Sequence, residues 1–425
     1  MAIFFKIAGI SLGAIGYMIF NPLFWFVIII TALVHKRNSK MEFAMLGYNE
    51  PLWRKVLNSL LAGLLAGILG SSISVFLGIT IEQYMPGEGV FGSGILYIWG
   101  IALLLSLLNQ RYLCFSYAGG IVALTNLIIG YPNINAIGIL ALVGILHLAE
   151  SLLIFIDGHS NAIPGFFKLK NGEIVGGFFM NRVWPLPVLI FFITLLTGDV
   201  VESVAMPDWW PIIKQPGLRY DLENIMYILQ PIPVVLGYGD IAITKNPASR
   251  CKDSSLRLAA YSIVLICLCV IASKIRAFAY IAALFSPIGH ELLILYGQNE
   301  EELGVHRFVH PDEGLMVLYS KKDFPGSKMK IDTGDLIISI NNNEINNEEH
   351  LNEILKDYPT YIWLDIIKSD GIEKTVEYKD YVKGIGDLGI IFATENPKAF
   401  FEIKKGLPLI DKIRDVLNKI FKSNS

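Results

Sequence analysis

The solvent preference of the chain changes near Tyr296, and this change constrains the fold more than any single motif. Long apolar runs dominate the sequence before Tyr296, whereas residues 313–393 read as a water-soluble, β-rich stretch. Lipid and water impose different rules on a backbone, because a segment exposed to lipid must satisfy all its hydrogen bonds internally. We therefore predict a polytopic α-helical membrane bundle over residues 1–296, followed by a small α+β domain over residues 300–395.

The composition agrees with this division. Of the 425 residues, 53% are hydrophobic and only 17% are charged, whereas a soluble chain is about a quarter charged. The net charge is −3 and no basic patch is interleaved with aromatic residues, which argues against a nucleic-acid partner. The N-terminus is apolar, contains Lys6 and has no small-residue cleavage site. We therefore expect no cleaved signal peptide.

Apolar runs predict seven to nine membrane spans, since a bilayer core needs about 20 apolar residues per helix. One clear run ends at Val34, and the others cover residues 57–81, 94–108, 112–130, 134–156, 184–198 and 257–273. Residues 224–238 and 277–296 are also apolar but contain prolines, which interrupt helices. These two segments are either short spans or re-entrant segments buried in protein.

Loop charges predict the orientation of the bundle. Residues 35–56, 157–183 and 240–257 carry an excess of Lys and Arg, whereas residues 82–93 carry two glutamates and no base. Positively charged loops remain on the cytoplasmic side of a membrane. We therefore expect a multi-pass protein of the plasma membrane whose C-terminal domain is cytoplasmic.

Hydrophobic periodicity predicts the elements of the soluble domain. The segment Leu336–Ile340 alternates in polarity and runs into a polar turn, as a half-buried strand does. Similar patterns predict strands at 315–319, 361–368 and 373–378, and a helix at 348–356.

This domain resembles a bacterial PDZ domain. The resemblance rests on Pro325-Gly326-Ser327, on Gly334-Asp335-Leu336-Ile337 and on Asn341 to Ile345. An unrelated α+β domain is the alternative. PDZ domains bind an extended peptide by adding it to the edge of their sheet beside a helix. The resemblance implies a groove lined by Gly314, Leu315, Val317, Tyr319, Leu351 and Ile354.

The sequence does not determine which kind of peptide this groove would bind. The loop that would hold a peptide carboxylate falls near Glu313 and Gly314, and it lacks a glycine-rich form. Both a C-terminal peptide and an internal segment therefore remain candidates.

The end of the chain, residues 397–425, predicts a basic amphipathic helix. Apolar residues from Leu409 to Phe421 share one helical face, and Lys and Arg residues occupy the other. Such a helix lies on an anionic membrane surface, docks on a partner, or packs on its own domain.

Two pairs of ionisable residues lie within the predicted spans. His147 and Glu150 are one helical turn apart, so they form either a structural hydrogen bond or a path for protons or solutes. His290 and Glu291 begin the sequence GHELLI, which starts like the zinc motif HExxH. Ile294 replaces the second histidine, so we expect His290 and Glu291 to cap or pair within their own helix.

The sequence predicts no catalytic residue, no metal and no cofactor. The cysteines Cys114, Cys251, Cys267 and Cys269 have no metal or redox spacing and are interpreted as small apolar fillers. The protein is accordingly not expected to be an enzyme. An intramembrane metalloprotease of the site-2 type in degenerate form, or a transporter, is the alternative.

Five stretches spread along the chain match one family: NPLFWFVIIITALVHKR from Asn21, GEIVGGFFMNRVWPLPVL from Gly172, LGYGDIAITKNP from Leu236, LFSPIGHELLILYG from Leu284 and DLGIIF from Asp387. Through these stretches the chain resembles, over nearly its whole length, the MinJ-type division-site determinants of Gram-positive bacteria. Members of this family are polytopic membrane adaptors that link the curvature-sensing protein DivIVA to the MinC–MinD division inhibitor.

The resemblance implies a scaffold at the division septum or the poles, with membrane lipids, DivIVA-like and MinD-like proteins as partners. Paired small residues in the predicted spans, such as Ala62-Gly63, Ala66-Gly67 and Gly119-Gly120, permit close approach of helices. They predict a compact bundle, with a homo-oligomer as a further option.

Overall fold

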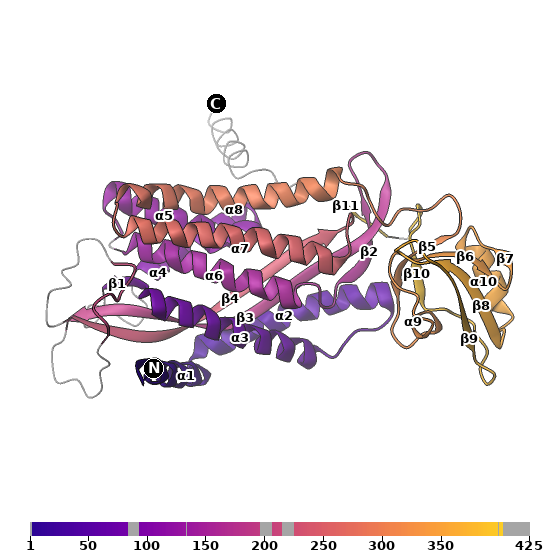
Figure 1. Ribbon diagram of the computed structural model, residues 1–425, viewed down its shortest axis with the longest axis horizontal. Helices are drawn as coiled ribbons and strands as arrows, with labels where there is room; N and C mark the ends of the chain where they lie inside the picture. Colours follow the sequence, from indigo (N-terminus) through magenta and orange to yellow (C-terminus); the bar gives the residue numbers. More distant parts are fainter. Residues whose placement is uncertain are drawn as a thin grey trace, which may run out of the picture.

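The computed structural model describes residues 2–83, 93–132, 134–195, 206–214, 225–397 and 399–402. It consists of a helical bundle packed around a long β ribbon, with a small β-rich module at one end (Figure 1). Of residues 397–425, predicted to form an amphipathic helix, Phe401–Glu402 form a short strand instead, and residues 403–425 lie outside the described residues.

The helices follow the predicted apolar runs closely. They are α1 (Ala2–Tyr17), α2 (Pro22–Leu46), α3 (Leu52–Leu77), α4 (Ser93–Leu108), α5 (Phe115–Ile129), α6 (Ala136–Asp157), α7 (Pro247–Ala272) and α8 (Ala277–Leu303), with the short 3₁₀ helices η1 (Met18–Phe20) and η2 (Gln110–Leu113). Asn21 caps α2 by accepting a hydrogen bond from the Leu23 N–H, and the chain bends by 73° there.

Within the described residues, four helices are long and apolar enough to cross a membrane: α3, α6, α7 and α8. The number becomes five if the bent pair of α1–η1 and α2 counts as one span, and α4 and α5 are shorter apolar helices. The described part of the chain thus contains four or five candidate spans, whereas seven to nine were predicted for the whole chain.

Part of this difference is a wrong assignment of secondary structure. Residues 184–198 were expected to be a helix and 224–238 a span or re-entrant segment. Their described parts, residues 184–195 and 225–238, instead belong to strands β3 (Ile174–Leu195) and β4 (Ile225–Ala242). The two strands pair antiparallel without interruption from Phe178↔Ala242 to Leu195↔Ile225. A strand surrounded by apolar side chains on both faces shows no alternation in polarity, so its sequence looks like that of a buried helix.

The register of the ribbon explains how prolines fit into paired strands. Pro185 lies opposite Val235, Pro187 opposite Pro233, and Leu189 opposite Pro231. All four prolines therefore occupy the alternate positions whose N–H would point away from the partner strand, where proline removes no bond of the ladder.

Helix α3 and strand β1 (Thr80–Gln83) complete the outer edge of β3. The Leu189 N–H donates to Ser71 Oγ (3.0 Å), and the Phe191 N–H donates to the Ile79 carbonyl (3.2 Å). Backbone groups in an apolar environment must find partners within the protein. Proline has no N–H, and these two bonds give partners to two others. Few outward N–H groups are therefore left without a partner along this stretch of the ribbon.

Glycines of α3 allow the helix to approach this edge. A Cβ at Gly63 would lie 2.0 Å from the Pro185 carbonyl oxygen, and one at Gly67 would lie 2.4 Å from that of Pro187. The paired small residues of the sequence thus serve contact between a helix and a strand here, whereas Gly120 serves the contact of α5 with Pro287 of α8.

The elements of the C-terminal module are β5 (Leu315–Ser320), α9 (Pro325–Lys328), β6 (Leu336–Ile340), β7 (Asn343–Glu344), α10 (Glu348–Lys356), β8 (Tyr361–Ile367), β9 (Glu373–Lys379) and β10 (Ile390–Phe392). The predicted strands at 315–319, 336–340, 361–368 and 373–378 and the predicted helix at 348–356 are confirmed to within one residue, whereas α9, β7 and β10 were not predicted. The strand order is β10-β5-β6-β8-β9, with β7 paired to β6. The local alternation and the turns of this module were sufficient for the prediction.

The module packs directly against the bundle. Phe308 and Leu318 are fully buried within the core of the bundle, and Gly176 of β3 lies against both. The Gly176 N–H also donates to the Phe308 carbonyl (2.8 Å). After β10, strand β11 (Phe401–Glu402) pairs with β2 (Ile163–Lys168), which pairs with β3. The chain is therefore attached to the bundle on both sides of the module.

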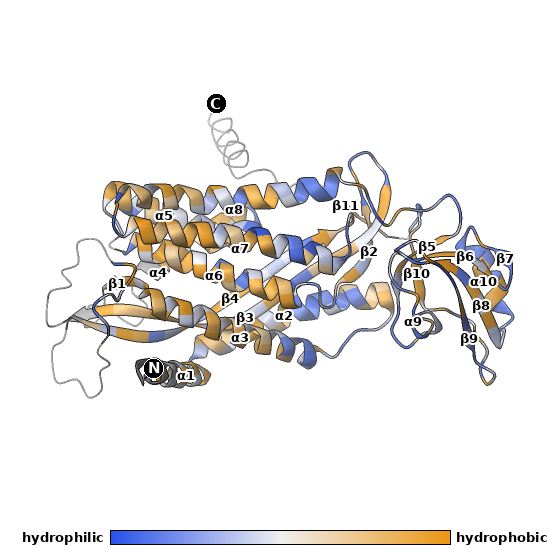
Figure 2. Ribbon diagram, in the orientation of Figure 1, coloured by the Kyte–Doolittle hydropathy of each residue, from blue (hydrophilic) through white to orange (hydrophobic). Residues whose placement is uncertain are grey.

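The end of the bundle that faces the module is hydrophilic (Figure 2). Arg250 on α7, only 2% exposed, contacts Asp240 of β4 (2.8 Å) and Glu300 of α8 (2.9 Å). Glu301 accepts hydrogen bonds from the Ile243 and Thr244 N–H groups. These contacts join β4, α7 and α8 at the end where the chain leaves the bundle.

Candidate functional sites

Three potential metal-binding side chains meet inside the bundle. Cys114 is the N-cap residue of α5, His147 lies in the middle of α6, and His290 lies on α8. The sulfur of Cys114 is 3.0 Å from His147 Nε2 and 3.7 Å from His290 Nε2. The three atoms all lie within 4.8 Å of one another.

The other ring nitrogen of each histidine has an oxygen partner. His147 Nδ1 lies 2.8 Å from the Val143 carbonyl and donates its N–H to it, because a carbonyl oxygen can only accept. His290 Nδ1 lies 3.4 Å from the Tyr117 hydroxyl, which itself donates to Glu291 (2.6 Å). Both rings thus turn Nε2 toward the same sulfur.

Ion pairing and aromatic packing hold the surroundings in place. Glu291 also pairs with Arg111 (2.7 Å). The ring of Tyr261 packs edge-on against both His147 (5.6 Å) and His290 (5.9 Å), while its hydroxyl donates to the Ser286 carbonyl (2.8 Å).

This geometry corrects two expectations from the sequence. His290 and Glu291 do not cap or pair within α8 but connect it to α5 and its preceding turn. The cysteines were expected to form no set with histidines, yet Cys114 joins His147 and His290. No spacing pattern signals this cluster, because the three residues are separated by 33 and 143 positions in the sequence.

The pair of His147 and Glu150 is part of the same neighbourhood. Glu150 interacts electrostatically with both His147 and Cys114. The expected hydrogen bond between His147 and Glu150 does not form, because both ring nitrogens of His147 have other neighbours.

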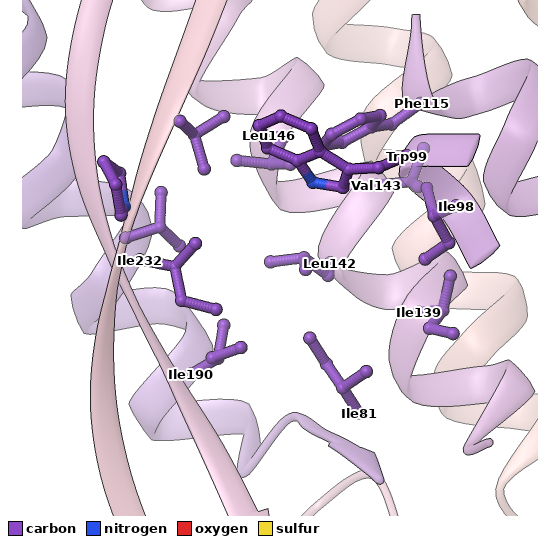
Figure 3. A pocket seen from close by; sticks show the side chains of 13 residues that line it. Ile81, Ile98, Trp99, Phe115, Ile139, Leu142, Val143, Leu146, Ile190 and Ile232 are labelled. Carbon is purple, nitrogen blue, oxygen red and sulfur yellow. The ribbon is translucent and has the colours of Figure 1, made fainter. Parts of the chain in front are cut away.

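A small apolar cavity of about 40 Å³ adjoins the cluster. It is bounded by β3 and β4 on one side and by α4, α5 and α6 on the other, and Figure 3 shows Ile190 and Ile232 opposite Leu142 across it. Its lining is aliphatic and aromatic throughout, and it includes Phe115 and Val143, which neighbour Cys114 and His147 in the chain or on the helix. The indole nitrogen of Trp99 is the one polar side-chain atom among the described residues that line it.

The residues of the predicted peptide groove do not line an open edge. Strand β5 was expected to be an edge strand, but β10 pairs with it on one side and β6 on the other. Leu315, Val317 and Leu351 are buried in the core of the module, and Ile354 packs partly against that core. The expected edge at Leu315–Tyr319 is therefore wrong, because the chain downstream of β9 returns to cover it.

Gly314 and Tyr319 have other roles than ligand contact. Gly314 adopts a left-handed conformation (φ 79°), and its N–H donates to the Asn346 side chain (3.1 Å). Tyr319 packs against the core of the bundle. Burial and a hydrogen bond with Tyr48 raise its pKa above the usual range.

The free side of β10 is the alternative edge beside a helix. Among the described strands, β10 pairs with β5 alone. The preceding loop touches the end of α10, because Gly384 and Gly386 both lie against Tyr358. Asp387 closes the turn into β10 by accepting a hydrogen bond from the Gly389 N–H (2.7 Å).

Comparison with known proteins gives one named relative. No family model matches the chain. The chain is similar to the "Cell division topological determinant MinJ" of Bacillus subtilis (strain 168). The two sequences are 22% identical in an alignment 411 positions long, which covers 91% of this chain and 95% of the relative. The resemblance to MinJ-type division-site determinants that the sequence motifs predicted is thereby confirmed, and it extends over nearly the whole chain.

Proposed function

We propose that the protein is a membrane-embedded scaffold that positions regulators of cell division. The observation that carries this proposal is the similarity to MinJ across both the helical bundle and the module. A function based on the module alone would not require similarity over the bundle as well.

The proposed location is the plasma membrane at division septa or poles, with the module in the cytoplasm. The excess of Lys and Arg in residues 35–56, 157–183 and 240–257 supports this orientation. Activity of an alkaline-phosphatase fusion after Ser425 outside the cell would contradict it.

The module is proposed to act as a PDZ-like peptide-binding domain. Its order of strands and helix supports this assignment, and β10 is a better edge for strand addition than β5. A partner segment would extend the sheet along β10, between this strand and α10, next to the loop from Gly384 to Gly389. DivIVA-like and MinD-like proteins are the proposed partners.

The bundle is proposed to do more than anchor the module. Leu318 and Phe308 are buried in the bundle core, so the module has a defined orientation relative to the bundle. A scaffold benefits from this arrangement, because fixed orientation reduces the entropy that partners lose on binding.

The proposed groove is tested with Ile354→Asp, which places a charge on the partly buried face of α10. We expect the full-length variant to lose septal localisation and co-purification of division proteins in the native bacterium. Asn352→Asp adds the same charge on the exposed face of the same helix and should behave like wild type. Normal localisation and unchanged partner recovery in a folded Ile354→Asp variant would contradict the groove.

The role of the bundle is tested by grafting residues 300–425 onto an unrelated single membrane helix. We expect the graft to remain folded but to fail in restoring normal placement of division sites in a strain that lacks the protein. Full restoration would show that the bundle is only an anchor.

A further inference from the structure

We propose that Cys114, His147 and His290 bind one transition-metal ion, with Zn²⁺ the best fit, and that this ion joins α5, α6 and α8. The proposal concerns the interior of the bundle and is independent of the proposed scaffold function. It replaces the sequence-based expectation that the protein holds no metal.

The distances suit a single ion. Zinc lies about 2.3 Å from a thiolate sulfur and about 2.0–2.1 Å from a histidine nitrogen, in tetrahedral geometry. These bond lengths place sulfur and nitrogen ligands roughly 3.6 Å apart. The observed separations from the Cys114 sulfur are 3.0 Å and 3.7 Å, so small side-chain movements suffice to accommodate the ion.

The hydrogen bonds behind the histidines favour metal binding. A metal-binding histidine usually donates its second N–H to a carbonyl or a carboxylate, which fixes the tautomer and the orientation of the ring. The Val143 carbonyl serves this purpose for His147. Tyr117 serves it for His290 and passes the hydrogen bond on to Glu291.

The type of ligand selects the type of ion. Thiolate and imidazole ligands suit zinc and related transition metals, whereas magnesium and calcium prefer oxygen. The thiol proton of Cys114 is released to solvent when the sulfur–metal bond forms, because the metal binds the thiolate.

Charge balance supports an ion at this depth. An unpaired divalent cation would be costly in apolar surroundings. The Cys114 thiolate cancels one of its two positive charges.

The test is Co²⁺ binding to the full-length protein in detergent after removal of metals by a chelator. A cobalt–thiolate bond produces a charge-transfer absorption band in the near ultraviolet. We expect this band to saturate at one equivalent of Co²⁺ and to disappear when Zn²⁺ is added. Cys114→Ser should abolish the band, and His290→Gln should weaken binding or abolish it.

The matched control is Cys269→Ser, which removes another buried thiol and should retain the band. Tyr117→Phe keeps all three ligands but removes the partner of His290 Nδ1, so we expect affinity to fall roughly 10- to 100-fold. Circular dichroism and gel filtration establish that each variant is folded.

Two results would overturn the proposal. One is a wild-type protein, folded by the same criteria, that shows no charge-transfer band with Co²⁺. The other is a band that persists unchanged in Cys114→Ser, which would assign the bound metal to a different thiol.

Discussion

At the residue scale, Asp335 organises the turn that precedes β6. Its side chain is fully buried, and it accepts hydrogen bonds from the Asp332 N–H (2.8 Å), the Ser369 N–H (3.0 Å) and Lys368 Nζ (2.6 Å). Burial lowers the pKa of Lys368, but hydrogen bonds with Asp335 and Asp332 outweigh it and raise the pKa overall. This pair therefore stabilises the module at neutral pH, and the contribution is lost only as the pH rises through the raised pKa.

The first prediction is that Asp335→Asn destabilises the module by about 2 kcal/mol, since hydrogen bonds to a charged group contribute about 1.5–3 kcal/mol. Hydrogen exchange of the β6 amides in the full-length protein measures the change. Asp332→Asn is the control, because its side chain is 73% exposed; it should alter stability by less than about 0.5 kcal/mol. Equal effects of the two substitutions would refute the role assigned to Asp335.

At the scale of elements, the contact between α3 and β3 depends on glycine. The Pro185 carbonyl occupies the space where a side chain at Gly63 would begin. Close contact of this kind allows weak Cα–H···O bonds and excludes lipid from the edge of the ribbon.

The second prediction is that Gly63→Ala separates α3 from β3 and destabilises the bundle by about 1–3 kcal/mol, as overpacking typically does. The thermal unfolding midpoint of the protein in detergent should fall accordingly. Gly100→Ala, also in a helix, adds a methyl group with no neighbour within 4 Å and should not lower the midpoint. If Gly63→Ala is as stable as wild type, α3 does not lie against the ribbon as described.

At the scale of the whole molecule, the packing of the module on the bundle distinguishes this protein from a tethered pair of domains. Leu318 is the central contact, since it is fully buried in the bundle core although it belongs to a strand of the module. Gly176 of β3 lies directly against it.

The third prediction is that Leu318→Asp releases the module from the bundle while the module stays folded. Hydrogen exchange should accelerate in residues 306–314, which connect the two parts, and remain slow in β8. Ile372→Asp adds the same charge at a position that is 61% exposed and should change neither segment. Unchanged protection of residues 306–314 in Leu318→Asp would show that this contact does not hold the module.

The sequence alone determined those parts of the fold that depend on local interactions. Alternation in Leu336–Ile340 and the helical spacing in 348–356 predicted β6 and α10 with the observed bounds. Apolar runs such as 134–156 predicted helices such as α6. In each case one short segment contains the whole pattern of polar and apolar residues, and the period of that pattern distinguishes a strand from a helix.

Tertiary structure decided the parts that depend on partners distant in the chain. Residues 184–195 are apolar whether they form a helix or a strand, and only pairing with β4 makes them part of a ribbon. Likewise, β10 pairs with β5 although the two strands are about 70 positions apart in the sequence. Cys114, His147 and His290 share no motif, because each lies on a different element and packing alone brings their ligand atoms together. Hydrophobicity identifies which residues avoid water, but it does not specify which of them meet.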